Sequence, residues 1–169
     1  SMARYMPIDS EWFNKYGEPW SIERLVEIQT RADVNAAACG GTHGLFALSL
    51  ARNAAQATGR PLRGVWIEAD QKIRRYVSIA RSLQNGDDTF SSNHFSGPGY
   101  STEFGKRIAT SGHILEFLMV GASQDEMQQE WLTNGIRAIA RELIDHRKEA
   151  ADCGPLYHAL HALVLYQQR

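Results

Sequence analysis

The chain has 169 residues, with little cysteine and no excess of either charge. Cys39 and Cys153 are its two cysteines, which is too few for the disulfide framework of a small secreted domain. Its 18 lysines and arginines balance 19 aspartates and glutamates, so the composition indicates no basic surface for nucleic acid. We therefore expect a cytoplasmic protein that does not bind nucleic acid.

Long hydrophobic runs are also absent. No run approaches the roughly 18 residues of a membrane-spanning helix, so no membrane span is expected. The first residues, SMARYMPIDSEWF, lack the basic region followed by an apolar region that forms a secretory signal peptide. Ser1 and Met2 have the form of a remnant left by tag removal, and we expect the natural chain to extend further at this end.

Apolar residues recur with the helical period of 3.6, whereas the alternation typical of strands is nearly absent. This pattern predicts an all-α fold with a single helical domain over residues 21–169. The segment 1–20 is expected to pack on that domain through four aromatic side chains: Trp12, Phe13, Tyr16 and Trp20. The periodicity and the Gly and Pro breaks predict helices over 21–32, 42–57, 61–83, 112–120, 124–146 and 155–169.

The second, fourth and sixth of these helices carry one repeated phrase. HGLFAL at His43, HILEFL at His113 and HALHAL at His158 all read His-x-Leu-x-x-Leu, and each follows a glycine-bearing break. These three helices carry very little charge, while the first, third and fifth are amphipathic and charged. A helix that is apolar nearly all round is an interior helix, so three outer and three inner helices are predicted to alternate.

Three antiparallel helical hairpins with alternating burial predict an arc of hairpins whose inner helices run parallel. Parallel inner helices gather their N-termini at one end of the molecule. We therefore expect His43, His113 and His158 to line a common mouth, formed by the starts of the three inner helices.

The turn after the third predicted helix points to the same architecture. In QNGDDTFSSNHF, Gln84, Asp87 and Phe90 match a Gln-x-x-Asp-Gly-Ser-Phe motif, with Asp88 in place of its glycine. In this motif the chain resembles the α/α-toroid superfamily of terpenoid cyclases and protein prenyltransferases, over a span from about Gly40 to the C-terminus. The resemblance implies that the Gln side chain bonds to backbone at the next helix start and that the aromatic ring stacks at the turn. It also implies a half α/α-toroid, because the ring usually has twice as many hairpins.

The catalytic motifs of that superfamily do not carry over. One class of cyclases has an Asp-x-Asp-Asp-Thr motif, but Asn85 stands where its first aspartate belongs. The prenyltransferase zinc site has no match residue by residue. The pentapeptide CGGTH also occurs in editing domains of alanyl-tRNA synthetases, where it binds zinc together with an upstream His-x-x-x-His pair. That pair is missing here, since no histidine precedes His43.

Residues near the mouth offer two kinds of chemistry. Cys39 lies four residues before His43 and Cys153 lies five before His158, so these side chains form a candidate Cys2His2 zinc site, with His113 as an alternative ligand. Without a metal, the three repeated histidines are candidate catalytic acid and base groups.

Further residues are candidate ligand-binding groups around this mouth: Asp87, His94, Glu116 and His161. Glu116 follows His113 by one helical turn and is placed to orient a zinc-bound imidazole. His161 shares a helix face with His158. The alternative interpretation for all of these residues is structural, as helix caps or as part of the core.

Two classes of function remain open. The first is a non-catalytic module that binds a small molecule or a protein partner at the mouth. The second is an enzyme, or a fragment of one, that uses the three repeated histidines with or without zinc. The missing acid motif and the missing half of the ring favour the first. A half-ring leaves apolar edges exposed, so we expect a homodimer or docking on a missing remainder of a larger protein.

Overall fold

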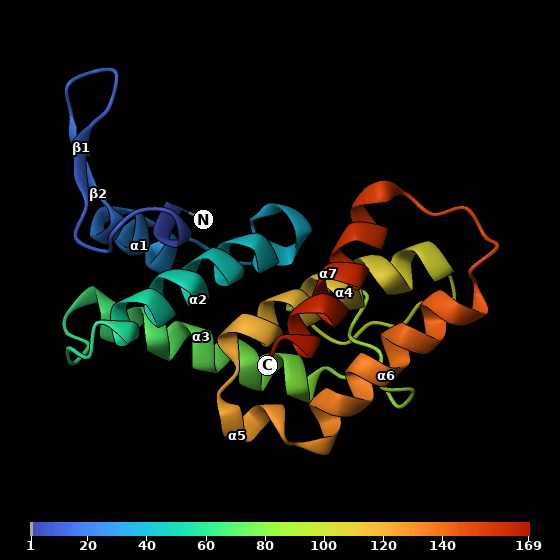
Figure 1. The fold of residues 1–169 in the computed structure, drawn as a ribbon. Helices are drawn as coiled ribbons and strands as arrows, with labels where there is room; N and C mark the ends of the chain where they lie inside the picture. The colour runs from blue at the N-terminus through green and yellow to red at the C-terminus, as the bar shows by residue number, and fades with distance from the viewer. Residues whose placement is uncertain (1) are drawn as a thin grey trace.

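The chain folds into a helical body from which a short β-hairpin projects (Figure 1). The computed structural model describes residues 2–169, so the interpretation of Ser1 as part of a tag remnant lies outside the described residues. Strands β1 (Glu11–Phe13) and β2 (Pro19–Ser21) form the hairpin and pair antiparallel. Apart from this hairpin the predicted all-α class is confirmed.

The N-terminal segment contacts the body through only some of its residues. Those that pack against the core are Ala3, Met6, Ile8 and Trp12. Phe13 and Tyr16 do not help to anchor the segment, because they lie in the projecting hairpin and are largely exposed.

The helical body contains seven α-helices and a 3-10 turn among its described residues. They are α1 (Ile22–Arg31), η2 (Ala38–Gly41), α2 (Thr42–Ala57), α3 (Val65–Ser82), α4 (Phe104–Gly121), α5 (Gln124–Met127), α6 (Glu130–Asp145) and α7 (Cys153–Gln167), and a further 3-10 turn, η1 (Met2–Arg4), precedes the hairpin. The prediction for 42–57 is confirmed at both ends, and Ser21 caps α1 by accepting a hydrogen bond from the amide of Arg24. None of the described helices has both the length and the apolar character needed to cross a bilayer.

Helix α4 starts well before the predicted Gly112, because glycines that favour a break in isolation are accommodated inside it. Gly112 lies where α7 comes closest: a Cβ added there would sit 2.7 Å from the backbone nitrogen of Ala159. The close packing of two backbones offsets the weak helix propensity of glycine at this point. The segment predicted as one helix over 124–146 instead forms α5 and α6.

Helices α2 and α4 run in the same direction. At one end, the rings of His43 and His113 are 5.0 Å apart between centroids. At the other end, Arg52 donates a hydrogen bond of 3.0 Å to the carbonyl of Gly121. The residue later in α2 thus contacts the residue later in α4, which requires the two helices to be parallel.

Helix α7 lies beside α4 and has the same direction (Figure 1). Gly112 meets Ala159, and farther along both helices the side chain of Arg169 donates to the carbonyl of Met119. The helices that carry the repeated phrase are therefore parallel, as their pattern predicts.

Burial differs among these three helices. From Thr110 to Gly121 every residue of α4 is buried. In α7 only Ala159 and Ala162 are buried, whereas Tyr157, Leu160 and Val164 are exposed. The prediction of an interior sixth helix is wrong, because no described element covers the outer face of α7.

The turn that contains Gln84 makes side-chain contacts with the start of a later helix, α6. The Gln84 side-chain amide donates to the carbonyl of Trp131, at the start of α6, over 2.8 Å, and to that of Asp88 over 3.0 Å. The ring of Phe90 meets that of Trp131 edge-on, with centroids 6.4 Å apart. The turn therefore joins the end of α3 to the start of α6.

The close approach of α4 and α7 can be tested with a matched pair of glycines. We expect Gly112→Ala to lower the free energy of unfolding by roughly 1–3 kcal/mol, because the methyl group must push α7 away. Gly105→Ala is the control: it lies in the same helix with nothing within 4 Å of an added Cβ. It should leave stability unchanged or raise it by up to about 1 kcal/mol. Urea unfolding measures both, and equal effects would contradict the packing described.

Candidate metal-binding site

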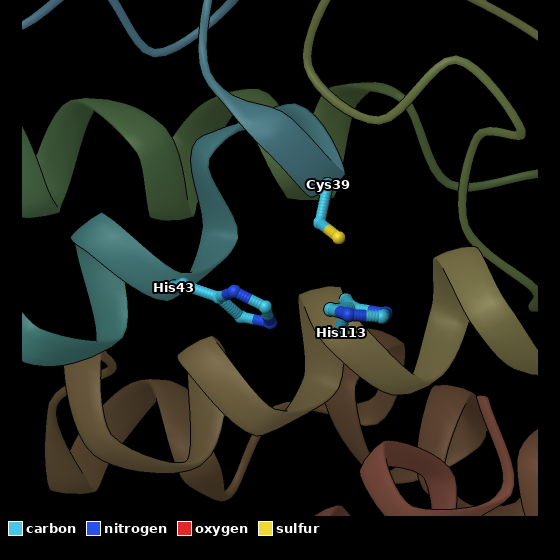
Figure 2. A group of neighbouring side chains, drawn as sticks. All are labelled: Cys39, His43 and His113. Carbon is cyan, nitrogen blue, oxygen red and sulfur yellow. The ribbon is translucent and has the colours of Figure 1, made fainter. Parts of the chain in front are cut away.

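The site begins at the turn before α2. Cys39, Gly40 and Gly41 have φ angles of 53°, 57° and 70°, in the left-handed region. Glycine adopts this conformation freely, but it costs an L-residue such as Cys39 roughly 1–2 kcal/mol. The turn folds the chain back, so that the thiol of Cys39 lies near the first turn of α2 and close to His43 (Figure 2).

Three side chains from separate segments converge in front of this turn. Cys39 from η2, His43 from α2 and His113 from α4 each offer one ligand atom, and these atoms lie within 4.8 Å of one another. Figure 2 shows the thiol and the two rings directed toward the same space. Sulfur and imidazole nitrogen are the ligands that zinc prefers in proteins.

The third repeated histidine lies against the other two. The ring centroid of His158 is 3.8 Å from that of His113 and 5.0 Å from that of His43. We call His43, His113 and His158 the histidine cluster. His113 lies in the middle of α4 rather than at its start, because more than two turns of the helix precede it. The parallel packing of the helices still brings the three rings together.

One buried carboxylate holds two of the imidazoles in α7. Glu116, only 5% exposed, lies with Oε2 2.8 Å from Nδ1 of His158 and with Oε1 2.5 Å from Nδ1 of His161. A carboxylate removed from water requires such partners. The two bonds engage the Nδ1 atoms and leave both Nε2 atoms available for other partners.

His113 has a defined tautomer and an unpaired nitrogen. Its Nδ1 is 2.6 Å from the carbonyl of Ala109, which can only accept, so Nδ1 carries the proton. Its Nε2 is therefore an acceptor, and it is buried without a hydrogen-bond partner. Buried polar atoms are nearly always paired, so an acceptor without a partner is unusual in this position.

Burial also keeps His113 neutral. The pKa of His113 is lowered to about 4, mainly by burial; the bond to Ala109 opposes this shift, and the neighbouring histidines add to it. Burial, followed by repulsion from Lys106, likewise lowers the pKa of His94. Neutral imidazoles at pH 7 are the form that binds metal.

His94 lies at the edge of the histidine cluster. Its ring meets that of His113 edge-on, with centroids 6.3 Å apart. A Cβ added to Gly40 would lie 2.3 Å from the Cβ of His94, so glycine is required for this approach. His94 therefore holds the long loop against the Cys39 turn.

Asp87, a candidate ligand-binding residue, lies outside the cluster. Its oxygens accept hydrogen bonds from the Thr89 hydroxyl over 2.6 Å and from Arg107 over 2.8 Å. Burial favours the neutral acid, but these bonds outweigh it and lower the pKa of Asp87. The carboxylate therefore stabilises the turn after α3.

Cys153 also lies outside the group that converges on Cys39. It is exposed, and it is the first residue of α7 rather than part of a break before the helix. His158 lies five positions further along the helix, about 7.5 Å along the axis and on another face. The predicted Cys2His2 set is therefore corrected: His113 takes the place of Cys153 beside Cys39 and His43.

Two contacts at the site were not predicted. Tyr157 stacks on His161 with ring centroids 5.4 Å apart, and the carbonyl of Ala109 orients His113. Tyr157 directly precedes His158, so its place beside the repeated phrase could have identified it as a residue of the site. Ala109 gave none, because the predicted helix began after it.

The fold and the site together define a helical protein with a cysteine–histidine cluster between parallel helices. Comparisons with models of known protein families, with curated proteins and with solved structures found no match. The chemistry of the site therefore rests on its geometry.

The neutral state of His113 predicts how the stability of the metal-free protein depends on pH. The group titrates at 6.5 when unfolded and at about 4 when folded, so the unfolded state binds more protons between these values. Stability is then fully present above pH 6.5 and is lost as the pH falls toward 4, by roughly 3 kcal/mol.

Denaturant unfolding across this window, with a chelator present, measures the loss. His113→Gln should reduce it, because glutamine does not titrate. His146→Gln is the control, since the pKa of His146 is raised by its bond to Glu149 and its effect has the opposite sign. A wild-type slope that persists in His113→Gln would contradict the assignment.

Proposed function

We propose that this protein is a metal-binding helical module that holds a divalent transition-metal ion, zinc first, at Cys39, His43 and His113. The observation that carries the proposal is the buried Nε2 of His113, which has no hydrogen-bond partner and lies beside a thiol and a second imidazole. A metal ion can accept lone pairs from all three ligand atoms at once, whereas a single N–H or O–H group donates mainly to one of them.

The spacing of the rings suits such an ion. A tetrahedral metal bound by two imidazole nitrogens at about 2.1 Å holds the ring centroids roughly 5 Å apart. The centroids of His43 and His113 are separated by 5.0 Å. The bond from Nδ1 of His113 to Ala109 is the kind of outer support that fixes a metal-bound imidazole.

The proposal extends to the architecture. An arc of hairpins, as in half of an α/α-toroid, is supported by the parallel course of α2, α4 and α7 and by the contacts of Gln84. In such an arc the ion joins separate hairpins at one end. This role is architectural, and it favours a module that binds ligands or partners over an enzyme.

Metal content tests the proposal directly. Protein purified with zinc present should hold about one ion per chain by elemental analysis, and cobalt substitution should give a thiolate charge-transfer band. Cys39→Ser should remove that band, and His113→Ala should lower the metal content sharply. Cys153→Ser and His146→Ala, at positions outside the site, should retain the metal. A wild-type protein without metal and without the band would refute the site.

The outer face of α7 favours a second function, which is self-association. Tyr157, Leu160 and Val164 are 57%, 47% and 46% exposed, and their spacing places them on one face. The helix has no charged side chain, so the same face of a second copy meets no repulsion. We propose that two copies pair through α7.

Sedimentation equilibrium tests this pairing. The wild-type protein should be a dimer at micromolar concentrations, and Leu160→Glu should be monomeric because the pairing would bury an unpaired charge. Ile67→Glu, at an equally exposed apolar position on α3, is the control and should remain dimeric. A wild-type protein that stays monomeric at all concentrations would exclude pairing through α7.

A further inference from the structure

We infer that His158 is the fourth ligand of this ion and that Glu116 is its positioning residue, so that the coordination shell is closed by protein. The inference rests on the proposed site at Cys39, His43 and His113. A shell of one sulfur and three nitrogens leaves no position for water or substrate, which is the arrangement of a structural metal site.

The position of His158 carries the first step. Its ring centroid lies 5.0 Å from that of His43, the same separation as between His43 and His113. Its separation from His113 is 3.8 Å, so binding requires these two rings to part by roughly 1 Å to reach the tetrahedral spacing.

The bond to Glu116 carries the second step. Nδ1 of His158 donates to the carboxylate, which leaves the lone pair of Nε2 for a metal. His113 is held in the same way by the carbonyl of Ala109. In both α4 and α7, therefore, Nδ1 of the imidazole is held by a hydrogen bond, and that bond does not use Nε2.

Charge balance carries the third step. Glu116 is buried, and within residues 2–169 its hydrogen-bond partners are the imidazoles of His158 and His161. A carboxylate in such a place needs a nearby positive charge. A divalent ion bound to the thiolate of Cys39 carries one net positive charge, which the carboxylate of Glu116 balances.

A closed shell would bind α7 to the rest of the fold. The ligands come from η2, α2, α4 and α7, so one ion joins three parallel helices. Helix α7 buries only two alanines of its own, so it gains most from this additional attachment.

His161 provides a matched control for His158. Both bond through Nδ1 to the same carboxylate, from the same helix. His161, however, stacks on Tyr157 and lies 6.2 Å from Phe46 between ring centroids, rather than joining the histidine cluster. Only His158 is assigned as a ligand.

Cobalt binding to the full chain tests the inference. His158→Ala should weaken cobalt affinity at least about 100-fold and should shift the d–d bands, while the thiolate band from Cys39 remains. Glu116→Gln should weaken affinity about 10–100-fold and should also shift those bands, because a loosened imidazole changes the ligand field. His161→Ala should change affinity by no more than a few-fold and should leave the spectrum as it is.

Added azide separates a closed shell from an open one without any variant. It should not perturb the cobalt spectrum of the wild-type protein, but it should perturb that of His158→Ala, where water occupies the fourth position. A wild-type spectrum that responds to azide, with His158→Ala equal to His161→Ala, would overturn the inference and leave the site at Cys39, His43 and His113 in place. A wild-type protein that binds no cobalt would overturn both.

Discussion

The backbones of α4 and α7 can meet because Gly112 has no side chain where Ala159 approaches it. This contact places His158 against His113 and brings two α7 imidazoles within reach of Glu116. With a larger residue at 112 the helices would stand apart, and the carboxylate would be buried without these partners. The polar interior of the protein therefore depends on an apolar contact between two small residues.

The polar groups at the cluster are arranged so that one of them remains unsatisfied. Three imidazoles lie in contact, and burial makes protonation of His113 unfavourable, as its lowered pKa of about 4 shows. Hydrogen bonds hold the Nδ1 atoms of His113 and His158. What is left is a set of lone pairs and a thiol around one space, and these are the groups assigned to the proposed metal ion.

Much of the fold could be predicted from the helical period of the apolar residues and from the glycine and proline breaks between helices. The helix over 42–57 follows from its apolar pattern and from the breaks on both sides, and it is confirmed. The start of α4 could not be predicted, because Gly105 and Gly112 resemble breaks until the neighbouring helix is known. The burial of α7 was misjudged because an apolar helix on an open face has the same composition as an interior helix.

The sequence alone determined that three histidines recur at the start of one repeated phrase and that Cys39 lies four residues before His43. Both are local properties, set by the spacing of residues along one helix or turn. Tertiary structure alone decided that His113 rather than Cys153 joins Cys39 and His43, and that Glu116 bonds to two histidines of α7. Those choices depend on where helices begin and which faces meet, and distant packing contacts set both.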